Sequence, residues 1–133
     1  MAMPSVLLRG AIVLAALLLD QQAGATEVAA DALKDLATGK TWFASNTISG
    51  NQATSWSWKA DGTVCMWIGS PSGKCSDDGT WKIVDKRICY RLTWWGKSYD
   101  MMSACFSVMD LGDGSYEATL PSGTFFLKFR VSP

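Results

Sequence analysis

The stretch ICYRLTWWGKSYDMMSACF, Ile88–Phe106, contains two apolar segments, each with one cysteine, separated by a polar bend. Pairing the two segments symmetrically about this bend places Ile88 opposite Phe106 on an apolar face. On the other face the same register places Cys89 opposite Cys105, and a disulfide can join such a non-hydrogen-bonded pair. Hydrophobic alternation and cysteine position therefore choose one register, which predicts a β-hairpin closed by a disulfide.

The segments before this hairpin pair in the same way. A register centred on Asp61 places Trp56 opposite Met66 and puts Cys65 on the opposite face. The loop GSPSGK then returns the chain to Cys75, close enough to bridge Cys65. We therefore predict the second bridge as Cys65–Cys75, which is one of three possible connectivities for four cysteines.

The four cysteines are expected to be structural. An even number of cysteines in a short exported chain is typical of a disulfide framework. The chain has no histidine, no Cys-x-x-Cys motif and no close cysteine pair, which argues against a zinc site and against a thioredoxin-like redox site. We expect no metal and no cofactor.

From Lys40 onward, short segments rich in aromatic and β-branched residues alternate with turns that contain Gly, Ser and Asp. The turns are too short for parallel crossovers, so neighbouring strands should pair antiparallel. We predict an all-β fold, an up-and-down meander of about eight strands that closes into a small calycin-like or lipocalin-like barrel. The predicted strands are Thr41–Ser45, Thr54–Lys59, Thr63–Ile68, Thr80–Val84, Ile88–Trp94, Met101–Met109, Tyr116–Leu120 and Thr124–Val131.

Residues 1–25 have the pattern of a cleaved secretory signal peptide. Arg9 precedes the apolar run Ala11–Leu19, and small residues follow at Ala23 and Ala25. The apolar run is far shorter than the about 20 residues of a membrane-spanning helix, so an uncleaved anchor is the weaker interpretation. We therefore expect a periplasmic or secreted protein with no integral membrane segment after cleavage.

Residues 26–38 are predicted to form a short helix or a leader to the domain. The apolar spacing is helical, Thr26 is a candidate N-cap and Gly39 is a stop. Residues 39–133 then form a single β-barrel domain, which we expect to be a monomer.

Charge and composition exclude several classes of function. The chain has 12 basic and 12 acidic residues and no basic run, which argues against a nucleic acid as partner. Without histidine there is no Ser-His or Cys-His dyad, and we predict no catalytic residues. The carboxylate pairs Asp77-Asp78 and Asp110/Asp113 lie in turn-like sequences, where Asp serves backbone geometry.

Tryptophan is the distinctive residue of this sequence, with seven copies. Four of them, Trp42, Trp56, Trp58 and Trp81, share strand faces with aliphatic residues and are expected to fill the core. Adjacent residues in a strand point to opposite faces, so at least one of Trp94 and Trp95 should lie near the surface. The candidate ligand- or partner-binding residues are Trp67, Trp94, Trp95 and Tyr99.

The segments DDGTWKIVDKRICYRLTW and SACFSVMDLGDGSYEATL resemble the proteobacterial exported family catalogued as domain of unknown function 995. The resemblance covers residues 36–127, including the opening GKTW, and it does not extend to the Cys65/Cys75 pair. It implies a secreted or periplasmic protein and no particular activity. The matching positions are Gly79, Trp81, Ile88, Cys89, Cys105, Gly112 or Gly114, and Tyr116.

Two functional hypotheses remain open. The first is non-catalytic binding of a small apolar or amphipathic ligand or a cell-envelope component. A barrel has room inside for side chains or one small ligand, so an interior filled by Trp56, Trp58 and Trp81 with no cavity would contradict this small-ligand form. The alternative is a protein–protein module in the envelope, such as a lysozyme or protease inhibitor. PSGTFF, Pro121–Phe126, resembles a segment of periplasmic lysozyme inhibitors, and secreted-metalloprotease inhibitors share the small-barrel plan.

Overall fold

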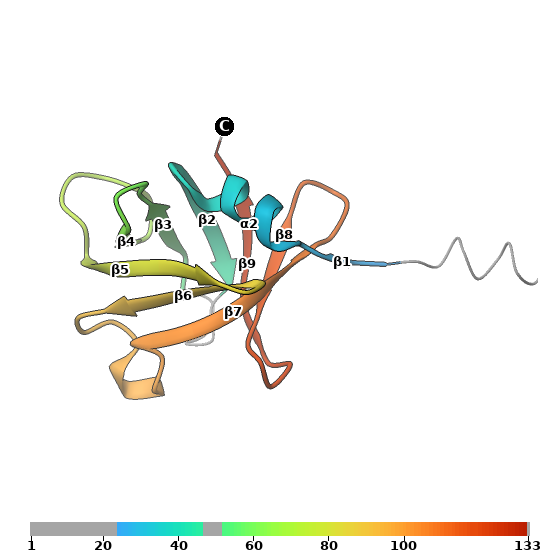
Figure 1. The fold of residues 1–133 in the computed structure, drawn as a ribbon. Coiled ribbons are helices and arrows are strands. Elements are labelled where there is room, and N and C mark those ends of the chain that lie inside the picture. Colours follow the sequence, from blue (N-terminus) through green and yellow to red (C-terminus); the bar gives the residue numbers. More distant parts are fainter. Residues whose placement is uncertain (1–23, 47–51, 133) are drawn as a thin grey trace, which may run out of the picture.

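Eight strands close into an antiparallel barrel in the computed structural model, which describes residues 24–46 and 52–132 (Figure 1). Each strand pairs with its neighbour in the chain, and the last strand returns to pair with the first. The prediction of an all-β up-and-down barrel is confirmed. The barrel strands are β2 (Lys40–Asn46), β3 (Thr54–Trp58), β4 (Thr63–Ile68), β5 (Asp77–Val84), β6 (Arg87–Leu92), β7 (Ser103–Asp110), β8 (Tyr116–Thr119) and β9 (Phe125–Val131).

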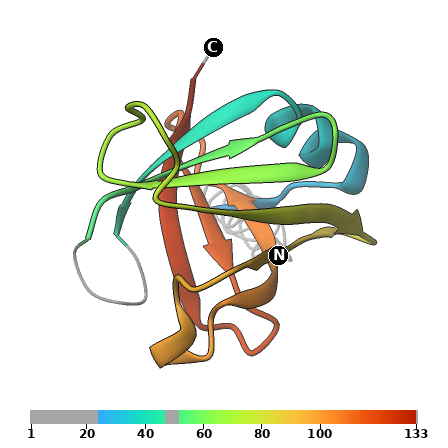
Figure 2. The same ribbon diagram turned by 90° about the vertical axis from the view of Figure 1, so that its left-hand side faces the viewer.

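The closed shape is clearest when the molecule is turned by 90° (Figure 2), where the strands surround a common interior. In Figure 1 the strands β5, β6 and β7 run across the view, whereas β2 and β9 run steeply to them. This tilt follows from the twist of a closed sheet, and closure leaves few unpaired strand edges.

Both hairpin registers predicted from the cysteines and the aromatic residues are confirmed. Ile88 pairs with Phe106 and Cys89 with Cys105. In the preceding hairpin the pairing about Asp61 is as expected, with Ser57 opposite Cys65. The disulfides are Cys65–Cys75 and Cys89–Cys105.

The N-terminal segment differs from the prediction in one respect. Thr26 is not a helix N-cap, because it belongs to a short ninth strand, β1 (Thr26–Glu27), and pairs with Asp110 of β7. The helix α2 (Ala30–Ala37) begins after Ala29, which makes no side-chain cap hydrogen bond. The predicted signal peptide lies outside the described residues apart from its last two positions. Within the described ranges, no helix combines the length and apolar character needed to span a bilayer.

Helix α2 covers one end of the barrel. Leu33 and Ala37 on its inner side have no exposed area and belong to the barrel core. The indole Nε1 of Trp42 donates to the Leu36 carbonyl at 3.1 Å, which ties the helix to β2. Because the strands alternate in direction, the β6–β7 connection and the start of β3 lie at the opposite end.

Aromatic side chains fill the barrel interior. Trp42 stacks on Phe129 with ring centroids 3.9 Å apart, and Trp56 stacks on Trp58 at 5.6 Å. These interior rings have 0–1% exposed area, so neighbouring side chains surround them and exclude solvent. The expectation that Trp42, Trp56 and Trp58 fill the core is confirmed. Trp81 is half-buried at the edge of this core, with its ring edge-on to Trp58 at 5.7 Å.

Candidate functional site

A groove with a volume of about 320 Å³ lies on the outside of the barrel, at the end opposite α2. The connection between β6 and β7 forms most of it and includes a short 3-10 helix, η1 (Lys97–Tyr99). Gln52, which precedes β3, and Ile68, the last residue of β4, complete the lining. The remaining lining residues are Trp94, Trp95, Gly96, Lys97, Ser98 and Tyr99.

Trp95 forms the floor of the groove. Trp95 is 5% exposed and belongs to the barrel core. The ring meets Trp56 edge to face, with centroids 5.4 Å apart and an interplanar angle of 85°. Trp95 therefore separates the filled interior from the groove, and a molecule in the groove would contact its outer edge.

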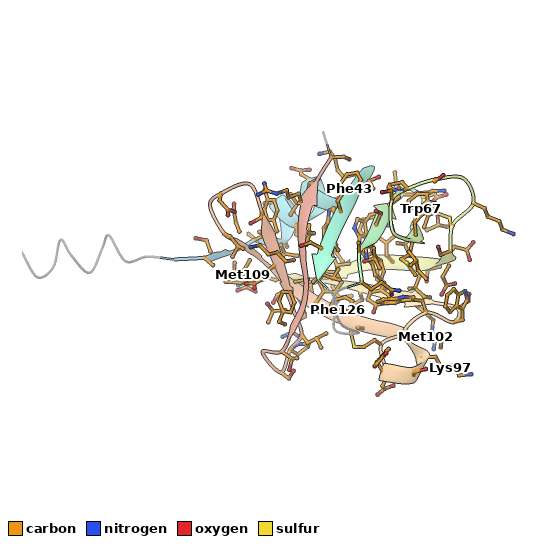
Figure 3. All side chains as sticks on the ribbon, turned by 180° about the vertical axis from the view of Figure 1, so that it is seen from behind. Phe43, Trp67, Lys97, Met102, Met109 and Phe126 are labelled. Atoms are coloured by element: carbon orange, nitrogen blue, oxygen red, sulfur yellow. A yellow bond between two sulfur atoms is a disulfide. The ribbon has the colours of Figure 1, made fainter. Side chains whose placement is uncertain are left out.

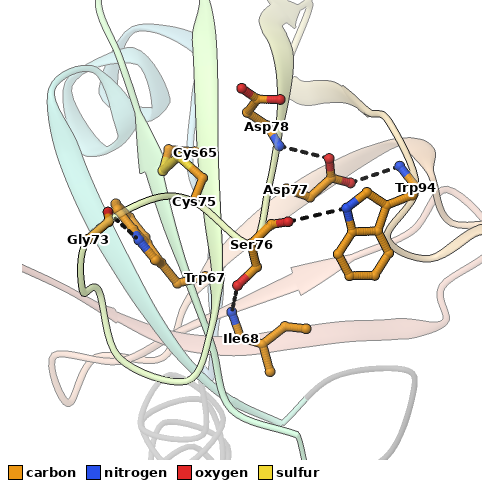
Figure 4. The surroundings of a disulfide bond; sticks show 9 residues. All are labelled: Cys65, Trp67, Ile68, Gly73, Cys75, Ser76, Asp77, Asp78 and Trp94. Carbon is orange, nitrogen blue, oxygen red and sulfur yellow. Dashed lines mark hydrogen bonds between the residues drawn. A yellow bond between two sulfur atoms is a disulfide. The ribbon is translucent and has the colours of Figure 1, made fainter.

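Trp94 points the other way and is 50% exposed. Its indole Nε1 donates to the Ser76 carbonyl at 3.2 Å, and its backbone N–H donates to the Asp77 carboxylate at 2.9 Å (Figure 4). The ring is thus exposed to solvent and held by one hydrogen bond to Ser76, while the backbone of Trp94 is held by Asp77, the first residue of β5. An exposed aromatic ring fixed in this way presents apolar area with little conformational freedom left to lose on contact.

The carboxylate of Asp77 organises this part of the site. The side chain is 4% exposed and accepts the backbone N–H groups of Trp95 at 2.8 Å and of Trp94 at 2.9 Å. The Thr93 hydroxyl and the Asp78 N–H also donate to it. Burial opposes the charged form, but the hydrogen bonds from Thr93, Trp95, Trp94 and Asp78 outweigh it and lower the pKa of Asp77.

The sequence interpretation of Asp77 as a turn residue is wrong. Asp77 is the first residue of β5, and apart from Asp78 its partners lie 16 to 18 positions further along the chain. The interpretation is correct for the other pair, because Asp110 accepts the Gly112 N–H at 2.8 Å and Asp113 accepts the Ser115 N–H at 3.0 Å. The difference arises because β6 ends at Leu92, two residues before the predicted end, and the chain then bends around the Asp77 carboxylate.

The far side of the β6–β7 connection has its own anchor. The Tyr90 hydroxyl donates to the Met101 carbonyl at 2.5 Å, and burial raises the pKa of Tyr90. Met101 in turn donates its N–H to the Gly96 carbonyl at 2.8 Å. Gly96 has φ of 82°, and a Cβ there would lie 2.8 Å from the Met101 backbone, so only glycine fits. The connection is therefore fixed at both ends.

The Cys65–Cys75 disulfide holds the loop that contacts Trp94. It closes the loop that leads from β4 to Ser76 and Asp77, the two residues that hold Trp94 (Figure 4). Ser76 also accepts the Ile68 N–H on its Oγ at 2.9 Å, which joins the end of β4 to the start of β5. The bridge therefore fixes the segment on which the Trp94 ring rests.

Trp67 lies outside the groove. Its indole Nε1 donates to the Gly73 carbonyl at 3.3 Å, so the ring packs under the disulfide-closed loop. Figure 3 shows Trp67 well away from Lys97 of η1. Of the four aromatic residues named from the sequence, the structure brings Trp94, Trp95 and Tyr99 together and separates Trp67 from them.

The groove combines exposed apolar surfaces with a few polar groups. Tyr99 is 57% exposed and Ile68 is 44% exposed, which gives two more apolar surfaces beside Trp94. Gln52 and Ser98 add neutral polar groups, and Lys97 is the only charged residue among the described lining residues. The described part of the chain holds no cluster of three metal-ligating side chains.

Comparisons of this chain with protein-family models, with curated proteins and with solved structures found no match. The function is therefore argued from the groove. Sequence reasoning named its aromatic residues but not Gln52, Ile68, Lys97 or the supporting Asp77. Only the fold brings Gln52, Ile68 and Asp77 to the aromatic bend, whereas Lys97 lies within the bend itself and no motif marks it.

Proposed function

We propose that this protein is a non-catalytic binder of a small amphipathic molecule or a cell-envelope component. The ligand binds in the groove on the outside of the barrel, at the end opposite α2. The observation that carries this proposal is Trp94, whose half-exposed ring donates to Ser76 and whose backbone N–H donates to Asp77. Exposed apolar side chains that sit together beside polar groups are typical of contact surfaces.

The barrel interior is a less suitable place for the ligand. Trp42, Trp56 and Trp58 have no exposed area, and a guest inside the barrel would have to displace them. Displacing a buried aromatic side chain costs about 3–5 kcal/mol, by comparison with Phe or Trp to Ala substitutions. The outer groove needs no such rearrangement, because its volume of about 320 Å³ is already open.

The compartment proposed for this function is the periplasm or the cell exterior. Two disulfides and the absence of a spanning helix from the described residues fit an oxidising environment. The signal-peptide pattern of residues 1–25 also favours export. A binder in that compartment would meet envelope components as its nearest ligands.

Binding of 8-anilinonaphthalene-1-sulfonate, an amphipathic aromatic probe, tests the groove. We expect the probe fluorescence to rise with the wild-type protein and to stay low with Trp94→Ala. The matched control is Trp67→Ala, which removes a tryptophan outside the groove and should leave binding unchanged. Probe binding that survives Trp94→Ala would place the apolar contact elsewhere and contradict the proposal.

A second candidate function is a protein–protein module, and one observation favours it. Ile68, Trp94 and Tyr99 are each 44–57% exposed on one rim of the barrel, as anchor residues of an interface are before binding. Inhibition of lysozyme or of a secreted metalloprotease by the purified protein at micromolar concentration would support this role. Loss of that inhibition in Trp94→Ala would assign it to the same rim.

A further inference from the structure

We propose that the ligand of this groove is a saccharide that carries a carboxylate group. This inference rests on the proposed function and narrows the amphipathic ligand to one chemical class. Three properties of the lining lead to it: exposed aromatic side chains, neutral hydrogen-bonding groups beside them, and a single positively charged residue.

The aromatic faces suit a sugar ring. A pyranose ring has an apolar face made of C–H groups, and the face of an aromatic ring carries partial negative charge that attracts them. Trp94 and Tyr99 are the two most exposed aromatic residues in the described structure, and both line the groove. The hydrogen bond from the Trp94 indole to the Ser76 carbonyl already restricts this side chain, so less side-chain entropy is lost when a sugar ring stacks on it.

The polar groups suit the hydroxyls of a sugar better than the tail of a lipid. Gln52 contributes an amide, while Ser98 and Tyr99 contribute hydroxyls. A hydrocarbon chain would cover these groups without satisfying them, at a cost of about 1–3 kcal/mol for each buried group. The volume of about 320 Å³ is at the lower end of the range for ligand sites. A groove of this size is too small to enclose a long acyl chain.

The positive charge of Lys97 favours a sugar that carries a negative charge. Lys97 is the only charged lining residue among those described, and its ammonium can pair with a carboxylate. Asp77 keeps its negative charge, but it does not line the groove and its oxygens face the donors of Thr93, Trp94 and Trp95, so Lys97 is the charge that a ligand in the groove can contact. Asp100 follows η1 without lining the groove. The groove therefore favours a negative charge on the ligand.

Cellobiouronic acid and cellobiose form a matched pair of probes, because they differ only by a carboxylate in place of a hydroxymethyl group. We expect the wild-type protein to bind the acid about fivefold more tightly at low salt, which is the upper range for an exposed ion pair. Lys97→Gln should remove this preference, so that the variant binds the two sugars with equal affinity. Raising the salt concentration should have the same effect on the wild type.

Two Trp94 variants separate stacking from folding. Trp94→Phe keeps a ring and should keep most of the affinity for both sugars, whereas Trp94→Ala should abolish binding of both. Circular dichroism and the melting temperature report whether each variant is folded, and Trp67→Ala provides a folded control with one tryptophan fewer.

The outcomes distinguish this inference from the proposed function. If both sugars bind equally and Lys97→Gln changes nothing, the acidic-saccharide assignment is overturned. If neither sugar binds but the anilinonaphthalene probe does so in a Trp94-dependent way, the assignment is overturned and the groove remains a binding site. If neither the sugars nor the probe bind, both proposals fail.

Discussion

The Asp77 carboxylate accepts the Trp95 backbone N–H at 2.8 Å, across 18 positions of the chain. This contact links the first residue of β5 to the bend that closes the open end of the barrel. The same carboxylate also accepts the N–H of Trp94, so one buried side chain directs one indole inward and the other outward. The inward ring completes the core, and the outward ring lines the groove.

Replacing Asp77 by Asn should destabilise the fold and loosen the groove. Hydrogen bonds to a charged group contribute about 1.5–3 kcal/mol, and an amide would turn a donor toward the N–H groups of Trp94 and Trp95. We expect the free energy of unfolding, measured by urea denaturation, to fall by about 2 kcal/mol. Asp78→Asn is the matched control, because this neighbour is exposed and should change stability by less than about 0.5 kcal/mol.

Stability should depend on pH through Asp77. Its pKa in the folded state lies below the ordinary value of 3.8, so the unfolded chain takes up protons first as the pH falls. The stabilisation is therefore present above about pH 4 and is lost as the pH falls through the lowered pKa. Hydrogen bonds from Thr63 and Ser115 also lower the pKa values of Asp61 and Asp113, so these residues act in the same direction.

The pH dependence can be assigned by comparing the wild type with Asp77→Asn. Urea denaturation at several pH values between about 6 and about 2 should show a smaller decline in the variant. Equal declines in the two proteins would mean that Asp77 is not the group responsible.

The two disulfides should differ in what they support. Replacing Cys89 and Cys105 together by Ala should lower the melting temperature more than replacing Cys65 and Cys75, because the first bridge joins two adjacent barrel strands. The loops span 16 and 10 positions, so the chain-entropy contributions are nearly equal. A loss of about 2 kcal/mol corresponds to a shift of about 8–16 °C in a domain of this size.

The smaller stability effect of the Cys65–Cys75 bridge should come with a larger effect on binding. Its loop leads to Ser76 and Asp77, which hold the Trp94 ring. In the folded double-alanine variant we expect weaker binding of the anilinonaphthalene probe, whereas the folded Cys89/Cys105 variant should bind it as the wild type does. If the Cys89/Cys105 variant bound the probe more weakly than the Cys65/Cys75 variant, the disulfide-closed loop would not be what supports the groove.

Gly79 should tolerate no side chain. A Cβ at this position in β5 would lie 1.7 Å from the Arg91 carbonyl oxygen, which is backbone and cannot move aside. Glycine within a strand often marks such a close approach of two backbones. We expect Gly79→Ala to abolish folding or to lower the free energy of unfolding by more than about 3 kcal/mol. The exposed neighbour Thr80 offers a control, since Thr80→Ala should change the free energy of unfolding by less than about 0.5 kcal/mol.

The barrel could be predicted because its determinants are local. Alternating apolar residues and short turns define each hairpin, and the opposed Cys89 and Cys105 fix one register independently of hydrophobicity. Closure adds only the β2–β9 pairing, which removes the two free edges of the meander. The short strand β1 was missed because two residues with no apolar pattern carry no sequence signature.

The site could be predicted only in part. The adjacent Trp94 and Trp95 predict that one ring is exposed, because neighbouring side chains in an extended segment point to opposite sides. The roles of Asp77, Ile68 and Gln52 depend on contacts between distant segments, which no local pattern encodes. Trp67 was misplaced for the same reason, since the loop that covers it is held by the Cys65–Cys75 bridge.

The central claim is that ligands contact this barrel on its outer groove and leave the aromatic interior untouched. The most direct test is an NMR titration of ¹⁵N-labelled protein with 8-anilinonaphthalene-1-sulfonate, following the indole N–H resonances of the seven tryptophans. We predict shifts for Trp94 and Trp95, with the resonances of Trp42, Trp56 and Trp58 unchanged. Shifts confined to those three interior indoles, with Trp94 unmoved, would contradict the account.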